Sequence, residues 1–374
     1  MNPNSDPPSV TVVIACHDPK RPLRRAVASV LQSRAAKVLV VAHNLEAAQL
    51  AAVLDKDVSG SGRGAGAGRL STHPRVEILE LRDGLHSPAG PFNYGLSRVQ
   101  TRFAAIMGSD DFLDPGAVDV WVALAKRYHA DMVITRLQRG GRDARRPVHT
   151  PPVRPWLRGL ADFRRDRLYY RSAPLGLMRV SRLRELGLEM TPGLAVGEDI
   201  AFSMRLYASS RVVVQRRGLG YVVGEDGPAR VTLQSRPIAA ELAHIPDLLG
   251  RAWAKAWPVA VRRAVAAKTL RIHVFGVVLN RERDWWDVEQ RQALAAITRE
   301  LLDFAPGCER VFSRADTALV EAILRPAVPV DVLRQRAQAR RRFLSFGALM
   351  PAHREGWFAA EGPWRFAAAS FLVQ

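Results

Sequence analysis

The amino-acid sequence predicts an α/β fold, in which a mostly parallel sheet is flanked by helices and is followed by a C-terminal helical region. Three observations support this prediction. Apolar, β-branched runs alternate with helix-like segments as far as residue 135. The β signal fades after about residue 236, and prolines punctuate the helix-like segments beyond that point. We therefore expect an α/β domain over residues 1–235 and a helical region over residues 236–374.

The first expected strand, residues 10–16, is a continuous apolar, β-branched run, which is typical of a parallel strand buried on both faces. Further strands are expected over residues 37–43, 76–81, 102–107 and 131–135. Apolar residues at helical spacing predict helices between these strands. Those helices span residues 22–33, 45–54, 92–100 and 117–128. Strands that alternate with helices in this way imply right-handed βαβ units.

Two inserts interrupt the alternation. Residues 59–68 are glycine-rich but lack the Gly-Lys-Ser/Thr ending of a phosphate-binding loop, so we expect a flexible surface loop. Residues 140–155 are rich in arginine and proline, and we expect them to form a loop over the sheet face. Beyond residue 236, periodicity predicts helices over residues 238–249, 259–279, 286–302, 315–324 and 330–344.

The composition limits the classes of function. The formal net charge is +19, which suits a solvated surface or attraction to anionic lipid, phosphorylated substrates or nucleic acid. Zinc-finger, RNA-recognition and basic-zipper signatures are absent, so we do not expect a nucleic-acid partner. Apolar runs of about 18 residues and a secretory signal are also absent. Because Cys16 and Cys308 are the only cysteines, we expect a cytoplasmic protein, with peripheral contact at the inner membrane face and self-association through the helical region left open.

The most informative motif follows the strand at residues 102–107. Two adjacent carboxylates, Asp110 and Asp111, come directly after it. Loops at the carboxyl end of such strands face the crevice where ligands of α/β sheets bind. Two acids there suit a hard divalent cation, which prefers oxygen ligands and substrate phosphates. A solvated turn is the alternative, in which Asp114 caps a helix that Pro115 opens.

A second acidic pair, Glu198 and Asp199, lies at the start of a predicted helix. Carboxylates at this position are favoured by the helix dipole, so a purely structural role is one interpretation. The functional interpretation is a general base that takes a proton from an acceptor hydroxyl.

The order of these features resembles family 2 glycosyltransferases of the GT-A fold. The resemblance covers roughly residues 9–232. It begins with an apolar strand and polar turn at residues 10–18, a helix at 23–32 and a second strand at 37–41. It continues with a helix start containing glycine and asparagine at 89–96, an Asp-x-Asp-Asp-like pattern at 108–111 and a Glu-Asp pair at 198–199.

The resemblance implies roles for individual residues. Asp111 corresponds to the acid that coordinates Mn²⁺ or Mg²⁺ on the donor diphosphate, and Asp110 to the acid near the ribose or the metal. Asp199 corresponds to the catalytic base of inverting enzymes, with Glu198 as its partner. The remaining expected donor-binding residues lie at the first turn, at the end of the second strand and in the 89–96 segment, and are His17, Asp18, Asn44 and Asn93.

The sequence departs from the family pattern at two positions. Gly108 stands where the metal motif usually begins with an acid, and Ala42-His43-Asn44 replaces an Asp-Asp-Gly-Ser ending. His43 or Asn44 can still accept a hydrogen bond from a nucleobase. The signature of processive synthases is absent, and Gln215-Arg216-Arg217-Gly218 resembles it only in part.

The resemblance therefore implies a metal-dependent inverting glycosyltransferase that moves a sugar from a nucleotide-diphosphate donor to a hydroxyl of a cell-envelope glycan, glycolipid or polymer. A nucleotidyltransferase and a non-catalytic sugar- or polymer-binding relic of the fold are the alternatives. Arg216, Arg217 and Arg230 are near enough in sequence to reach the diphosphate or an anionic acceptor, although solvated surface arginines are the favoured interpretation.

Overall fold

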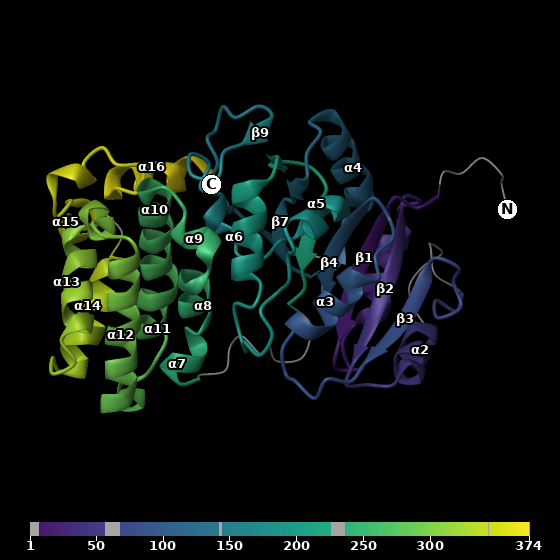
Figure 1. Cartoon of the computed structure of the whole chain (residues 1–374), viewed down its shortest axis with the longest axis horizontal. Helices are drawn as coiled ribbons and strands as arrows, with labels where there is room; N and C mark the ends of the chain where they lie inside the picture. The colour runs from purple at the N-terminus through teal and green to yellow at the C-terminus, as the bar shows by residue number, and fades with distance from the viewer. Residues whose placement is uncertain (1–6, 57–67, 142–143, 226–235, 343, 374) are drawn as a thin grey trace.

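The computed structural model describes residues 7–56, 68–141, 144–225, 236–342 and 344–373 (Figure 1). Apart from Gly68, the predicted glycine-rich loop at 59–68 lies outside the described residues, as does Arg230. Helices coloured green to yellow stand beside the sheet-containing part of the chain in Figure 1.

The main sheet has eight strands, and four of its neighbouring pairs are parallel. The predicted strands form close to their expected positions, while β9, β10 and β11 were not predicted. The strands are β1 (Val10–Cys16), β2 (Ala36–His43), β3 (Val76–Leu81), β4 (Phe103–Gly108), β6 (Met132–Ile134), β9 (Leu160–Ala161), β10 (Gly176–Arg179) and β11 (Val212–Val214), in the spatial order β3-β2-β1-β4-β10-β6-β11-β9.

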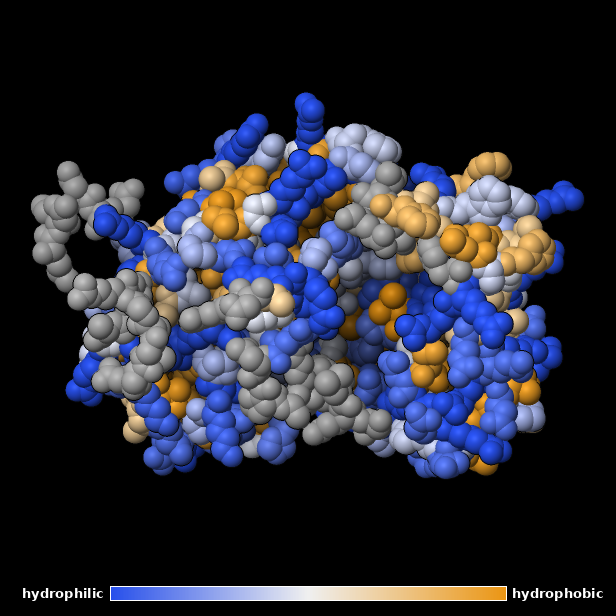
Figure 2. Space-filling model, turned by 180° about the vertical axis from the view of Figure 1, so that it is seen from behind, coloured by the Kyte–Doolittle hydropathy of each residue, from blue (hydrophilic) through white to orange (hydrophobic). Residues whose placement is uncertain are grey.

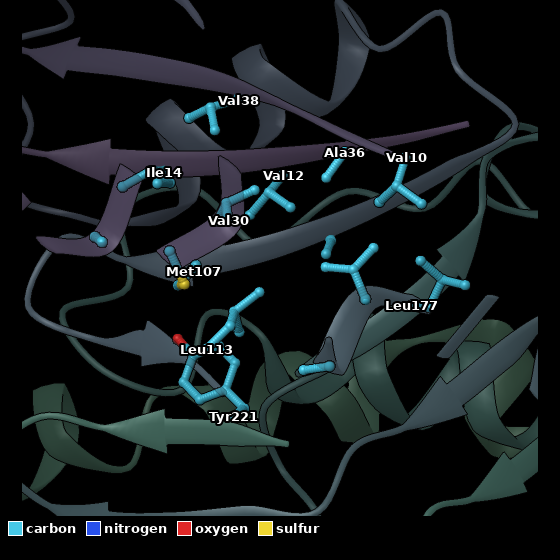
Figure 3. Close-up of a cluster of buried hydrophobic side chains, with 14 of the residues drawn as sticks. Val10, Val12, Ile14, Val30, Ala36, Val38, Met107, Leu113, Leu177 and Tyr221 are labelled. Atoms are coloured by element: carbon cyan, nitrogen blue, oxygen red, sulfur yellow. The ribbon is translucent and has the colours of Figure 1, made fainter. Parts of the chain in front are cut away.

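Helices cover both faces of this sheet because successive strand side chains point to opposite sides. Val10, Val12 and Ile14 of β1 pack with α1, α2 and α4 on one face, where Figure 3 shows Val12 and Ile14 near Val30 of α1. Val13 packs on the other face with α3, α5 and α6. The helices are α1 (Leu23–Leu31), α2 (Ala47–Asp55), α3 (Ala89–Ser97), α4 (Ala117–Arg127), α5 (Val180–Glu185) and α6 (Ile200–Ser209).

A second sheet corrects the loop expected over residues 140–155. Part of that segment forms β8 (Arg145–Val148), which pairs antiparallel with β7 (Leu137–Gly140). The order β5-β12-β7-β8 is completed by β5 (Phe112–Leu113) and β12 (Tyr221–Val223). Most of β8 is solvent-exposed and charged, so it carries no apolar pattern that would predict a strand.

The predicted helix cap at Asp114 is wrong. Helix α4 begins at Ala117, and its N-cap is Gly116 with a φ of 86°. The Asp114 carboxylate instead accepts a hydrogen bond from the Gly220 amide at 2.9 Å and pairs with Arg145. The left-handed glycine separates the acid from the helix, and Asp114 joins the second sheet to the loop before β12.

The remainder of the described chain is helical. The expected helix at 238–249 is interrupted, while the one at 259–279 continues through a π-helical turn. An apolar core of buried leucine, isoleucine, valine and phenylalanine side chains holds these helices together. They are α7 (Ile238–Glu241), α8 (His244–Gly250), α9 (Ala252–Lys255), α10 (Val259–Thr269), η3 (Leu270–Val274), α11 (Phe275–Leu279), α12 (Val288–Phe304), α13 (Arg314–Leu324), α14 (Val330–Arg341), α15 (Phe346–Leu349) and α16 (Pro363–Val373).

A buried carboxylate joins the helical region to the sheet-containing part. Glu361 accepts hydrogen bonds from Tyr169, Tyr170 and Arg167, at 2.7, 2.8 and 3.0 Å. Arg271 of η3 lies 3.6 Å from the same carboxylate. Tyr169 and Tyr170 belong to a short 3-10 helix, η1 (Leu168–Tyr170).

The face opposite the one seen in Figure 1 is mainly hydrophilic. In Figure 2, hydrophilic side chains dominate the back of the molecule, with smaller apolar patches between them. No helix in the described ranges has the length and apolar character needed to cross a bilayer.

Candidate active site

A cavity of about 650 Å³ lies where β1, β2 and β4 end. His17 follows β1, Asn44 follows β2, and Asp110 and Asp111 follow β4, and all four line this cavity. Glu198 and Asp199, which precede α6, line it as well. The two acidic pairs, about 90 residues apart in sequence, therefore face a single cavity at the ligand-binding edge of the sheet.

The first acidic pair is held by specific partners. Asp110 forms an ion pair with Arg21 at 3.1 Å. Asp111 accepts a hydrogen bond from the Tyr221 hydroxyl at 2.6 Å and another from the Gly224 amide at 2.9 Å. The Asp111 carboxylate, together with burial, raises the pKa of Tyr221 well above its usual value, so this hydroxyl remains a donor.

The glycine that replaces the first acid of the metal motif has a packing consequence. A Cβ atom at Gly108 would lie 2.7 Å from Asp111 Oδ2 and 3.0 Å from Asp110 Oδ1. The Gly108 amide also lies 3.1 Å from the Tyr221 hydroxyl oxygen. The absence of a side chain at this position lets both carboxylates fold over the end of β4.

The donor atoms at this pair suit a hard cation. Both carboxylate oxygens of Asp111 accept hydrogen bonds, and Mg²⁺ commonly uses one or two carboxylates together with substrate phosphates. Across the described ranges, no group of three or more His, Cys, Asp or Glu side chains is arranged to hold a metal by itself.

The second acidic pair lies in a different environment. Asp199 is the N-cap residue of α6 but its side chain forms no capping hydrogen bond. Burial raises the pKa of both carboxyl groups, and the neighbouring Asp199 charge raises that of Glu198 further. A carboxylate whose pKa is raised toward neutrality is suited to accept a proton from a hydroxyl.

A buried cation from the helical region acts on Asp199. Lys268 of α10 is 1 % exposed, and its positive charge lowers the pKa of Asp199 against the effect of burial. Its Nζ lies 2.9 Å from His273 Nε2. The His273 ring in turn lies against the His244 ring, with 4.7 Å between centroids. Burial and the Lys268 charge lower the pKa of His244 to about 4, so this ring is neutral at pH 7.

The segment that carries the second pair is fastened on both sides. Asn93 of α3 accepts a hydrogen bond from the Met190 amide and donates one to its carbonyl, both at 2.8 Å. Thr191 donates to Asp247 of α8 at 2.9 Å. A Cβ atom at Gly197, whose φ is 77°, would lie 2.7 Å from His244 Cγ. Helices from both parts of the chain thus fix where Glu198 and Asp199 lie.

Two of the predicted donor-binding residues lie outside the cavity lining. Asp18 shapes the turn after β1 by accepting from the Lys20 amide at 2.8 Å, and Asn93 holds Met190. Asn44 lines the cavity, and its side chain bonds the backbone of Gly84 and Leu85 at 3.1 Å each.

Several residues that line or support the cavity were missed. Arg21 lies in the turn between β1 and α1, four residues after His17, so its place after β1 could have suggested it. His43, by contrast, was expected as an alternative acceptor to Asn44; it lines the cavity, and its ring lies 2.8 Å from the Asp83 carboxylate. Tyr221 and Lys268 come from segments with no motif, and sequence spacing gives no signal for them.

Comparison with known proteins agrees with this geometry. Residues 11–187 match the model of a family described as "Glycosyl transferase family 2". The matched segment includes His17, Asp110 and Asp111 and ends before Glu198 and Asp199. No curated protein matches the chain.

Solved structures of S. aureus TarS are similar over most of this chain. TarS 1–349 in complex with UDP-GlcNAc has a TM-score of 0.69 at 13 % identity, with 89 % of this chain and 91 % of that chain covered. TarS 1–349 in complex with UDP has a TM-score of 0.66 at 14 % identity and the same coverage. A longer TarS structure gives 0.67 at 13 % identity, covering 90 % of this chain and 56 % of that one. This similarity confirms the predicted fold class, an α/β sheet of GT-A type followed by a helical region.

Proposed function

The chain belongs to glycosyl transferase family 2 through residues 11–187, and from this premise we propose that it is an inverting enzyme that transfers a sugar from a nucleotide-diphosphate donor to a hydroxyl group. The observation that carries the proposal is the single cavity lined by both acidic pairs. The donor chosen for the first test is UDP-GlcNAc, because a solved structure of the similar TarS contains it.

The roles follow from the two carboxylate environments. Asp199 accepts the proton of the acceptor hydroxyl, since its pKa is raised by burial while Lys268 keeps it accessible to ionisation. Glu198 is the partner of Asp199 in this acidic pair. Attack from the face opposite the leaving diphosphate gives a single displacement with inversion at the sugar carbon.

The first acidic pair serves the leaving group. Asp110 and Asp111 would hold a Mn²⁺ or Mg²⁺ ion together with the donor phosphates, and this ion supplies neutralisation of the diphosphate charge. Arg21 adds a fixed positive charge beside Asp110. His17 and Asn44 line the part of the cavity after β1 and β2, where the nucleoside is expected.

The central experiment replaces the base. Asp199→Asn should keep the affinity for UDP-GlcNAc, measured by calorimetry, and lower the transfer or donor-hydrolysis rate by roughly 10²–10⁴-fold, the usual size of a general-base effect. Asp303→Asn, the same chemical change at an exposed position on α12, should leave both unchanged. Near-normal turnover in Asp199→Asn would overturn the assignment.

A second experiment addresses the cation. Asp111→Asn removes a charged oxygen ligand, so the gain in UDP-GlcNAc affinity on adding Mn²⁺ should disappear. Calorimetry of the unmodified chain and the variant, with and without Mn²⁺, measures this gain directly. An equal gain in both proteins would show that Asp111 does not bind the ion.

The alternatives separate in the same assays. A non-catalytic relic would bind UDP-GlcNAc without consuming it, and a nucleotidyltransferase would form pyrophosphate bonds from a nucleoside triphosphate. Acceptors to be supplied are glycans, glycolipids and polymers of the cell envelope. Flotation with anionic liposomes tests peripheral membrane contact, and light scattering tests self-association.

A further inference from the structure

A second cavity lies at the same edge of the main sheet as the candidate active site. Its volume is about 580 Å³, and residues that follow β6 and β11 line it. Strand β10 pairs antiparallel with both β4 and β6, so β6 runs in the same direction as β4. Because β11 is parallel to β6, β4, β6 and β11 all end at the same edge of the sheet. Strand β10 separates the two cavities within the sheet.

The lining of this second cavity is strongly basic. Arg136, Arg171, Arg216, Arg217 and His149 contribute to it. No aspartate or glutamate is among its lining residues in the described part of the chain. A concave surface with several cations and no acid concentrates anions.

Arg171 has a distinctive position in this cavity. It is 4 % exposed, and its Nε and Nη2 both donate to the Thr150 carbonyl oxygen. Its Nη1 is buried and has no hydrogen-bond partner within the described residues. Burial lowers the pKa of Arg171 to about 10, which shows how strongly this cation is desolvated.

Two other buried arginines are neutralised by carboxylates, whereas Arg291, which forms no ion pair within the described residues, donates to the Val328, Ala322 and Arg325 carbonyls. Arg167 pairs with Glu361 at 3.0 Å, and Arg271 pairs with Asp316 at 3.3 Å. For Arg171 the described residues form no ion pair, and burial of an uncompensated charge is costly. An anion bound in the cavity would supply the missing negative charge beside this guanidinium.

An apolar surface adjoins the basic cavity. Arg216 and Arg217 also line a neighbouring shallow hollow together with Trp156. Trp156 is 73 % exposed, so its ring presents a flat apolar face to solvent. The combination offers charge for an anionic group and a surface for the carbon skeleton attached to it.

We propose that this basic cavity binds an oxyanion, a phosphate or carboxylate group, carried by the acceptor of the transfer reaction. The proposal rests on the proposed function for its link to the acceptor, whereas the anion site itself does not depend on it. Arginine forks fit both phosphate and carboxylate oxygens, and the test separates the two.

The experiment measures binding of inorganic phosphate, and separately of acetate, to the full chain by calorimetry at low ionic strength. Arg216→Gln/Arg217→Gln should weaken phosphate binding at least tenfold, and Arg171→Gln should abolish it. Arg341→Gln/Arg342→Gln makes the same charge change at exposed positions at the end of α14 and should bind as the unmodified chain does. Phosphate binding that much exceeds acetate binding identifies a phosphate-bearing acceptor, and the reverse identifies a carboxylate.

Three results would overturn the proposal. These are no phosphate or acetate binding to the unmodified chain, equal losses in the Arg216/Arg217 and Arg341/Arg342 variants, or loss of binding in Arg21→Gln instead, which would place the anion in the candidate active site. Because Arg216 and Arg217 are exposed, their variant decides the matter even if Arg171→Gln fails to fold. Failure of UDP-GlcNAc turnover with phosphate binding intact would count against the proposed function only.

Discussion

The buried carboxylates of the helical region have closer charged partners than the second acidic pair at the edge of the main sheet. In the helical region, Asp316 pairs with both Arg271 and Arg340, and Glu361 collects two tyrosine hydroxyls and an arginine. In the candidate active site, Asp199 forms no capping hydrogen bond and shares its surroundings with another acid, Glu198. Compensated charges fix a structure, whereas uncompensated ones facing a cavity are available for chemistry.

The largest expected effect concerns the paired carboxylate Glu361 and the stability of the fold. Glu361→Gln leaves Arg167 and Arg271 buried with reduced compensation and should destabilise the fold by about 3–5 kcal/mol, the usual cost of breaking a buried ion pair from one side. Urea unfolding measures the change. Glu355→Gln, at an exposed pair with Arg310, should have little effect. Equal effects of the two variants would mean that the Glu361 cluster is not structural.

A smaller effect is expected where the two regions meet. Gly197→Ala strains a residue with a φ of 77° and places a Cβ against His244, so it should displace Glu198 and Asp199 and lower turnover at least tenfold. Gly193→Ala is the matched control, because Gly193 has a φ of 78° but nothing within 4 Å of the added Cβ. Recovery of turnover in the Gly197→Ala/His244→Ala double variant would assign the effect to the contact with His244.

The smallest expected effect concerns the pH profile. The Lys268 cation favours the ionised form of Asp199, so Lys268→Met should raise the pKa of Asp199. Since the carboxylate is the active form of the base, the acid limb of the kcat–pH profile should move to higher pH. Lys268→Arg, which keeps the charge, should retain the original limb. An unchanged limb in Lys268→Met would leave Lys268 with a packing role only.

Four of the five strands that the sequence predicts, β1, β2, β4 and β6, are buried on both faces, whereas β3 lies at the sheet edge and exposes Glu77 and Glu80. The 10–16 run matches β1 at both ends, because an unbroken apolar run has few other ways to be buried. The antiparallel β10 and the exposed β8 were missed since they are only four residues long and carry no alternating pattern. Asp114 was assigned to the wrong partner because its amide donor, Gly220, lies 106 residues away in sequence.

The same distinction holds for the site. Both acidic pairs could be predicted, since each lies next to an element boundary where side chains point to the sheet edge. Arg171 and Lys268 could not, because their importance depends on burial and on what surrounds them in space.

The fastening of residues 190–199 has a practical consequence for anyone who divides this chain. The segment shared with the family stops at residue 187, yet Thr191 is anchored by Asp247 and Gly197 rests on His244. A fragment cut at residue 235 would retain the part of the cavity after β1, β2 and β4, while residues 190–199 would lose their contacts with Asp247 and His244. The helices beyond that cut therefore support one wall of the candidate active site and should be kept in any chimera.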